Sequence, residues 1–126
     1  MKKIFKTKNA PEAVGAYSQA VRAGSFVFTS GQLPVNPDIG SMPEAVEEQA
    51  RQSMKNVGAV IEAAGGDYSH IVKTTVLLSD IGDFTAVNRV YESFFEGGYP
   101  ARSCFQAAAL PKGARVEIEA VAYVPE

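Results

Sequence analysis

The feature that most constrains the fold is a strict alternation of residues close to the C-terminal end. Over residues 115–124 every second side chain is apolar: Val116, Ile118, Ala120, Ala122 and Val124. This spacing places them on one face of a β-strand, and that face has to be buried. The intervening side chains point the other way and mix charge with apolar and aromatic surface: Glu117, Glu119, Val121 and Tyr123. The sequence therefore predicts a sheet whose two faces differ in character.

Two amphipathic helices are available to cover one face of this sheet. The first is expected to begin near Ser41, which forms a capping-box pattern with Glu44, and to end at the glycines of positions 65 and 66. Its apolar residues recur every three or four positions: Val46, Ala50, Met54, Val57, Ile61 and Ala64. The second is expected from Asp83 to the glycines at 97 and 98, with Phe84, Val87, Tyr91, Phe94 and Phe95 on its apolar side.

Four further segments have the composition of strands. Residues 25–29 and 71–79 are rich in β-branched and aromatic side chains, and the second is apolar on both faces, which is typical of an internal strand. Residues 17–23 are expected to pair with 25–29. Residues 101–107 are expected to lie antiparallel beside 115–124, joined by a turn. The order predicts an α+β fold: one mixed, mainly antiparallel sheet with two helices on one face.

The second face of the sheet is expected to be a subunit interface. On residues 101–107 the core face is assigned to Ser103, Phe105 and Ala107, and the other face to Arg102, Cys104 and Gln106. A face that mixes Val, Leu and Tyr with Arg and Glu is poor solvent-exposed surface. It is more typical of an interface that holds a polar site, so the pattern predicts a homo-oligomer.

Composition excludes several classes of function. A chain of 126 residues is expected to form a single domain over residues 1–126. A net charge of −2 argues against binding nucleic acid by bulk electrostatics. One cysteine and one histidine cannot form an internal disulfide or a His/Cys zinc site. The longest apolar run, residues 120–124, is too short to cross a bilayer, and the N-terminus lacks the pattern of a secretory signal, so a cytoplasmic location is expected.

The strand residues predict one cluster that could do chemistry. In the expected antiparallel pairing, Arg102, Cys104, Glu117 and Glu119 share one face. An arginine fork can hold a carboxylate by two parallel hydrogen bonds, and a glutamate can orient or deprotonate a water molecule. The same residues also fit a structural ion pair with a small buried thiol. Composition and residue patterns alone therefore indicate an oligomeric α+β domain with a candidate carboxylate-binding arginine.

Longer blocks of sequence resemble a known family. Residues 99–105 read Tyr-Pro-Ala-Arg-Ser-Cys-Phe, and Leu-Pro at 110–111 and Val-Glu-Ile-Glu-Ala at 116–120 follow. With further blocks at 9–11, 15–21, 28–34 and 80–95, they resemble the RidA family, reactive intermediate deaminases of the YjgF type that were once described as translation inhibitors. The blocks keep their order along nearly the whole chain. The departures are small: Ala16 stands where many members have proline, and residues 96–98 form a short segment.

The resemblance implies a fold, an assembly and an activity. It implies a homotrimer of chorismate-mutase-like subunits with three clefts between them. The deaminase branch hydrolyses imines and enamines such as 2-aminoacrylate, 2-iminobutanoate and 2-iminopropanoate to 2-keto acids and ammonia. No metal or organic cofactor is implied, and the expected partners are a small 2-imino or 2-keto acid and further copies of the chain.

The resemblance also implies roles for residues of the motifs. Arg102 would bind the substrate carboxylate, and Glu117 would position the water that attacks the imine carbon. Backbone groups near Cys104 would bind the imine end, with the thiol lining the pocket. The rest of the cleft would be completed by Tyr17, Ser30, Gly31 and Asn88, with Tyr17 a candidate contribution of the neighbouring chain.

Two alternative functions remain open from the sequence. A non-catalytic binder or sensor of small 2-keto acids would use the same arginine without needing Glu117. RNA cleavage or translation inhibition is also attached to the family, but nucleic acid is an unexpected partner for an acidic chain. The only basic cluster is more typical of a solvated chain end: Lys2, Lys3, Lys6 and Lys8.

Overall fold

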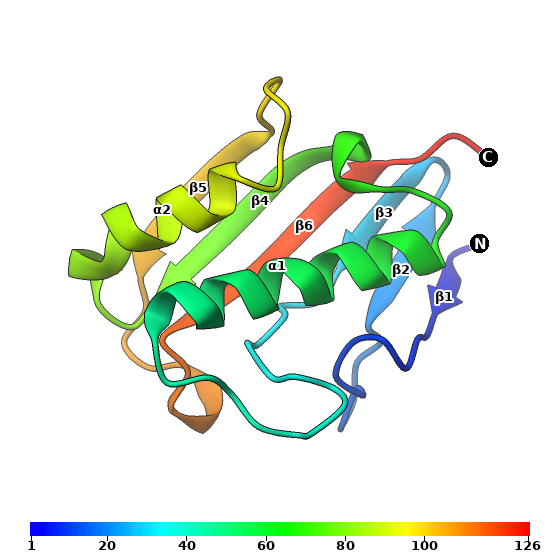
Figure 1. Ribbon diagram of the computed structural model, residues 1–126. Helices are drawn as coiled ribbons and strands as arrows, with labels where there is room; N and C mark the ends of the chain where they lie inside the picture. Colours follow the sequence, from blue (N-terminus) through cyan, green and yellow to red (C-terminus); the bar gives the residue numbers. More distant parts are fainter.

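A computed structural model describes residues 1–126 and contains one six-stranded sheet with two α-helices on the same face (Figure 1). Three short 3₁₀ turns precede β4, α2 and β6: Tyr68–His70, Ile81–Asp83 and Pro111–Gly113. The larger elements, in chain order, are β1 (Lys3–Phe5), β2 (Ala20–Ala23), β3 (Phe26–Thr29), α1 (Val46–Ala63), β4 (Ile71–Leu78), α2 (Phe84–Glu92), β5 (Ala101–Gln106) and β6 (Val116–Tyr123).

The strand order across the sheet is β1-β2-β3-β6-β4-β5. All neighbouring strands are antiparallel except β4 and β5, which run parallel. The predicted α+β class, the mainly antiparallel mixed sheet and the pairing of β2 with β3 are confirmed. Strand β1 was not predicted, because its three residues are too few to show a period of two.

The expected pairing of β5 with β6 is wrong, because β4 lies between them. The chain passes from β4 through α2 to β5, and a strand–helix–strand connection normally places its two strands side by side and parallel. The loop over residues 107–115 then allows β6 to enter the sheet between β4 and β3, where α1 lies over it (Figure 1).

The core lies between the helices and the sheet. The alternating residues of β6 are all buried there, with at most 4% of each exposed, against the apolar stripe predicted for the first helix. However, α1 begins at Val46, not near Ser41, and its N-cap, Ala45, has no side-chain cap. The Nε2 of Gln49 instead donates a hydrogen bond to the carbonyl oxygen of Pro43 at 2.8 Å. Pro43 also disfavours the helical region for Met42 before it, and residues 41–45 are irregular.

Helix α2 begins one residue later than expected and ends earlier. Asp83 is its N-cap and Glu92 its last residue, so Phe94 and Phe95 lie beyond the helix. Both phenylalanines still pack against the core as predicted. The glycines at 97 and 98 adopt φ angles of +91° and +59°, which glycine tolerates best, and they turn the chain toward β5.

The face of the sheet opposite the helices is apolar and uncovered in the monomer. Its large side chains are between 43% and 59% exposed: Ile4, Phe26, Phe28, Phe105 and Tyr123. The predicted faces of β5 are reversed: Arg102 and Cys104 pair with Thr74 and Val76 of β4, which are buried under the helices. Because β5 is an edge strand that is only partly covered, its burial pattern is too weak to assign its two faces from sequence.

The chain's helices are too short or too polar for any of them to cross a membrane.

Candidate functional site

Arg102 is an exposed residue of β5 that lies against helix α2. Its Nη1 donates a hydrogen bond to Oδ1 of Asn88 at 2.7 Å. Its guanidinium carbon lies 4.9 Å from the ring centre of Tyr91 and 5.3 Å from that of Phe84. The two rings can stabilise the cation electrostatically, and the amide oxygen fixes one arm of the fork.

The guanidinium of Arg102 has no carboxylate partner within the chain. The three ion pairs of the structure involve Arg51, His70 and Arg115, so none uses Arg102. The structural ion pair considered from sequence is therefore absent. Since a guanidinium has five N–H donors and Asn88 occupies one arm, the other donors remain available to an anion.

A cavity of about 340 Å³ opens beside this guanidinium. It is lined by the end of α2 and the start of β5: Asn88, Tyr91, Glu92, Tyr99, Pro100 and Arg102. A small organic acid fits a volume of this size. The sequence motifs indicate Arg102 and Asn88 but not the aromatic residues around them. The missed signal is helical spacing, because Phe84, Asn88 and Tyr91 recur at intervals of four and three and therefore share one face of α2.

Cys104 lies two residues further along the same face of β5 and is partly buried against the core. Burial raises the pKa of its thiol, and the nearby charge of Arg102 only partly offsets this effect. A raised pKa favours the neutral thiol, which is a weak nucleophile. The side chain is therefore suited to lining the site.

Glu117 lies on the opposite face of the sheet. It pairs with Leu77 of β4, and Leu77 in turn pairs with the exposed Phe105 of β5. The Glu117 side chain packs against Gly31, where an added Cβ would overlap its Oε2. Burial raises the pKa of Glu117, and repulsion from Glu119 raises it further. A half-buried carboxylate with a raised pKa is a stronger base than an exposed one, which suits it to accept a proton from water.

Ser30 and Gly31 belong to the Glu117 side of the molecule. The Ser30 hydroxyl donates to the Ser18 carbonyl at 2.6 Å, and its backbone N–H donates to the carbonyl of Gln19 at 2.9 Å. These bonds fix the residue before Gly31.

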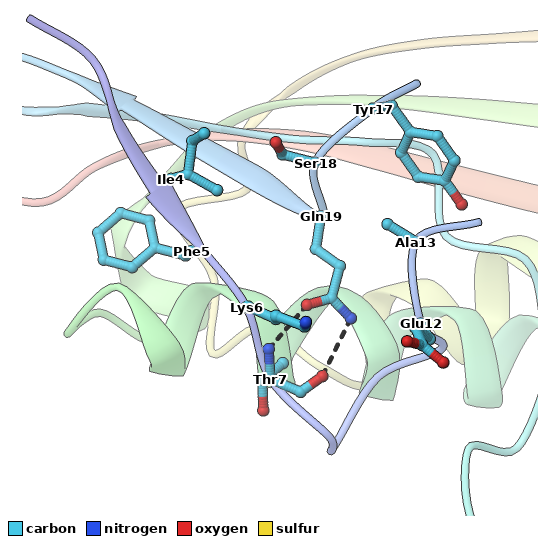
Figure 2. A pocket seen from close by; sticks show the side chains of 9 residues that line it. All are labelled: Ile4, Phe5, Lys6, Thr7, Glu12, Ala13, Tyr17, Ser18 and Gln19. Carbon is cyan, nitrogen blue, oxygen red and sulfur yellow. Dashed lines mark hydrogen bonds between the residues drawn. The ribbon is translucent and has the colours of Figure 1, made fainter. Parts of the chain in front are cut away.

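Tyr17 is half exposed and lines a second hollow, of about 190 Å³, beside the N-terminal segment (Figure 2). Gln19 anchors this hollow, because its side-chain amide accepts from the Thr7 backbone N–H and donates to the Thr7 carbonyl (Figure 2).

The candidate residues thus form two groups within one chain. One group lies at the β5 edge on the helix side of the sheet: Arg102, Asn88 and Cys104. The other group, Glu117 and Gly31, lies on the face of the sheet opposite the helices, which we call the open face. The expectation that Arg102 and Glu117 share a face of adjacent strands is wrong. Two strand spacings, about 10 Å, separate β5 from β6, and the sheet itself lies between the two side chains.

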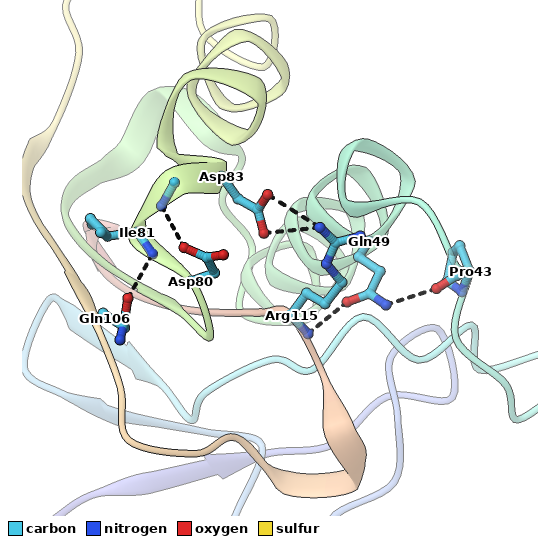
Figure 3. Close-up of polar contacts among 8 residues, drawn as sticks. Pro43, Gln49, Asp80, Ile81, Asp83, Gln106 and Arg115 are labelled. Atoms are coloured by element: carbon cyan, nitrogen blue, oxygen red, sulfur yellow. Dashed lines mark hydrogen bonds and ion pairs between the residues drawn. The ribbon is translucent and has the colours of Figure 1, made fainter.

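A polar network fixes the start of α2 relative to β6 (Figure 3). The Arg115 Nη2 lies 3.2 Å and 3.1 Å from the two carboxylate oxygens of Asp83, and its backbone N–H donates to Gln49 Oε1 at 2.8 Å. Gln106 accepts from the backbone N–H of Ile81 at 2.9 Å, which ties the end of β5 to the turn before α2. These bonds hold the helix that positions Asn88 and Tyr91.

The structure contains no group of three or more His, Cys, Asp or Glu side chains placed to hold a metal ion.

The sequence matches the family described as Endoribonuclease L-PSP over residues 7–124. The chain belongs to this family, which includes the RidA and YjgF proteins. Among family members it is 50% identical to the 2-iminobutanoate/2-iminopropanoate deaminase of Rattus norvegicus, over 97% of this chain and 90% of that protein.

Bacterial family members are equally similar. The Escherichia coli (strain K12) protein of the same name is 51% identical, over 97% of this chain and 98% of that one. The crystal structure of E. coli TdcF with bound serine superposes with a TM-score of 0.94 at 49% identity, covering 98% of this chain and 99% of that one. The resemblance stated from the sequence motifs is thereby confirmed.

Substitution of Gly31 tests whether the position of the Glu117 carboxylate matters. In Gly31→Ala the new Cβ forces the flexible end of Glu117 aside, so the fold survives while the carboxylate moves. We expect turnover of a 2-imino acid to fall at least about tenfold, because a small misplacement of a catalytic group is costly. The melting temperature of Gly31→Ala should stay within a few degrees of wild type. Gly40→Ala is the control: its φ of +73° strains alanine although the surrounding space is open, so it should lower the melting temperature but keep full turnover. Unchanged turnover in Gly31→Ala would contradict the assignment of Glu117.

Proposed function

We propose that the chain hydrolyses small 2-imino acids and their enamine tautomers to 2-keto acids and ammonia. The substrates we infer are 2-iminobutanoate, 2-iminopropanoate and 2-aminoacrylate. The observation that supports this most is the Arg102 guanidinium, which is oriented by Asn88, has no carboxylate partner and borders a cavity. The full-length similarity to mammalian and bacterial proteins named for this deamination supports it independently.

Binding in this proposal depends on the fork of Arg102. The free N–H groups of the guanidinium donate two parallel hydrogen bonds to the substrate carboxylate, which fixes both its position and its orientation. The backbone around Cys104 then lies beside the imine end of a molecule only a few atoms long. The serine bound to E. coli TdcF is an amino acid of comparable size and has the same carboxylate.

Hydrolysis then needs a positioned water and a proton relay. Glu117 accepts a proton as the water oxygen bonds to the imine carbon, and the C=N double bond becomes a single bond. The proton passes to nitrogen, the resulting carbinolamine collapses, and ammonia leaves as the keto group forms. An enamine enters the same path after it takes up a proton at carbon. Because the imine carbon is already electrophilic, this chemistry requires neither a metal nor an organic cofactor.

The separation of Arg102 from Glu117 within one chain leads to the assembly we propose. A substrate of this size cannot reach both residues across two strands and through the sheet. Packing of the uncovered open face against further copies would bring Glu117, Gly31 and Tyr17 of one copy to Arg102 and Asn88 of another. We propose the chorismate-mutase-like homotrimer that the resemblance implies, with three such clefts, and we propose the cytoplasm as its place of action.

The two alternative functions differ in what they require of these residues. A binder of 2-keto acids would need Arg102 but no turnover and no Glu117. RNA cleavage, which the family's description names, requires contact with phosphates. The net charge of −2 gives no general attraction for a polyanion.

A trapping assay tests the proposed activity. An amino-acid oxidase generates 2-iminobutanoate in the presence of semicarbazide, and the semicarbazone is measured with and without the protein. We expect wild type to lower the amount trapped in proportion to its concentration. If the purified wild-type protein leaves trapping unchanged, the deaminase proposal is wrong. RNA cleavage that survives Arg102→Ala and falls steeply with salt would support the alternative that uses nucleic acid.

A further inference from the structure

Tyr91 is a buried tyrosine whose hydroxyl has no role in the chemistry proposed above. The residue is 3% exposed, and its hydroxyl lies 2.7 Å from Oγ1 of Thr74, which is fully buried. Burial raises the pKa of Tyr91, although the Thr74 hydrogen bond and the charge of Arg102 act in the opposite direction. The phenol therefore keeps its proton at neutral pH. A buried hydroxyl is costly unless it is hydrogen-bonded, and the hydroxyls of Thr74 and Tyr91 satisfy each other, which fixes the orientation of the ring.

Thr74 and Tyr91 form a triangle with Arg102. Thr74 is the residue of β4 that pairs with Arg102 of β5, and the ring of Tyr91 lies 4.9 Å from the guanidinium carbon. The same helix, α2, presents Asn88, whose Oδ1 accepts from Arg102 Nη1. The guanidinium is thus held by a ring whose own orientation is fixed at its hydroxyl end.

We propose that Tyr91 is a positioning residue for Arg102. The Thr74 hydroxyl fixes the tilt of the ring, the ring supports the guanidinium, and Asn88 holds one arm. The remaining N–H groups then face the cavity in the orientation that a carboxylate requires. This inference rests on the proposed role of Arg102 as the carboxylate-binding residue.

Such a support is useful because Arg102 is on an exposed edge strand. A long, unpaired side chain on an edge would otherwise lose its rotamer freedom when the substrate binds, and this loss would weaken binding. A support can preorganise the fork only if it does not move. Tyr91 meets this condition because the Asp83–Arg115 ion pair holds the start of α2 (Figure 3), and because Phe95 packs 5.1 Å from the Tyr91 ring.

The test measures carboxylate binding and turnover separately. In Tyr91→Phe we expect the dissociation constant of 2-oxobutanoate, measured by titration calorimetry, to rise about three- to tenfold, with a parallel rise in KM and little change in kcat. Thr74→Val should give the same split between KM and kcat, whereas Thr74→Ser, which keeps the hydroxyl, should restore wild-type binding. In an Arg102→Lys background, Tyr91→Phe should add less than a twofold change, because the planar fork that it supports is already gone.

Tyr68→Phe is the matched control. Tyr68 is a partly buried tyrosine whose ring packs on Phe94, and its hydroxyl donates to the Met54 carbonyl at 2.8 Å, but it does not contact Arg102. Removal of this hydroxyl in Tyr68→Phe should lower the melting temperature about as much as Tyr91→Phe does, while 2-oxobutanoate binding and KM stay unchanged.

Two results would overturn the positioning role. One is unchanged binding and KM in both Tyr91→Phe and Thr74→Val while Arg102→Ala abolishes binding. The other is an equal loss of binding in Tyr68→Phe, which would indicate a general structural effect. Failure of the proposed function looks different, because the wild-type protein itself would then neither turn over 2-iminobutanoate nor bind 2-oxobutanoate.

Discussion

Arg102→Ala should lower kcat/KM for 2-iminobutanoate by about 10²- to 10³-fold, the usual cost of removing the partner of a hydrogen-bonded carboxylate. The loss should appear in KM and in 2-oxobutanoate binding, since the guanidinium fork grips the ground state and the transition state alike. Stability should change little, because Arg102 is exposed and has no ion pair to lose. Steady-state kinetics with thermal melting checks both statements.

Two substitutions show whether charge or shape matters at this position. Arg102→Lys keeps the positive charge but cannot make two parallel hydrogen bonds, so its activity should lie between those of wild type and Arg102→Ala. Arg89→Ala is the matched control, because Arg89 is an exposed arginine next to Asn88 on α2 and its loss changes the net charge equally. Arg102→Ala with wild-type kinetics, or an equal loss in Arg89→Ala, would contradict the assignment.

Glu117→Gln should remove turnover and stabilise the protein at the same time. We expect kcat to fall by about 10²- to 10⁴-fold, the usual contribution of a general base, while 2-oxobutanoate binding stays close to wild type. Continued binding without turnover would show that the two residues have separate tasks. A protein that only binds 2-keto acids would show no turnover in wild type or in Glu117→Gln, and its 2-oxobutanoate binding would not depend on Glu117.

The stabilisation follows from the sign of the pKa shift. Burial and the neighbouring Glu119 raise the pKa of Glu117 in the folded protein above its value in the unfolded chain. The folded state therefore binds this proton more tightly, and the free energy of unfolding falls as the pH rises through the raised pKa. A glutamine cannot ionise, so Glu117→Gln removes the free-energy cost of the half-buried negative charge. We expect this cost to be less than about 1 kcal/mol because the side chain is half exposed. The gain should be present at pH 7 and disappear in acid.

The pH dependence of turnover supplies a further readout of the same group. Activity of the wild type should fall as the pH drops through the raised pKa of Glu117, because the base must be ionised to accept a proton. Glu119→Gln removes the neighbouring charge, so the acid limb should move to lower pH while turnover at pH 7 is retained. An acid limb that does not move in Glu119→Gln, together with a melting temperature that falls in Glu117→Gln, would contradict this account of Glu117.

Much of the fold could be predicted from the sequence because its strongest patterns belong to buried elements. The alternation on β6 and the stripe of α1 both report burial on one side, and the structure buries both. The predictions failed where burial was partial. Edge strand β5 is mostly exposed, so its alternation did not show that Arg102 faces α2. The strand–helix–strand order of β4, α2 and β5 does indicate that β4 is its parallel neighbour, but the expected turn between β5 and β6 favoured the antiparallel pairing.

The sequence motifs supplied candidate residues for the site but not their arrangement. Arg102 and Asn88 do meet at 2.7 Å, and Glu117 does lie against Gly31. The motifs contain no information on which strands are neighbours, so Arg102 and Glu117 were expected on one surface and lie on two. Tyr91 was expected only as a core residue, since nothing in a helical stripe distinguishes a ring that packs from a ring that supports a cation.

The measurement that tests the central claim most directly is the activity of assemblies in which chains of two inactive variants are mixed. Arg102→Ala and Glu117→Gln chains with different affinity tags are unfolded, mixed in equal amounts and refolded, and particles with both tags are isolated. If each cleft takes Arg102 from one copy and Glu117 from the next, every mixed trimer regains one intact site of three, and the unfractionated mixture regains about a quarter of wild-type activity. Mixed particles that form but show no activity above the separate variants would contradict a site shared between copies.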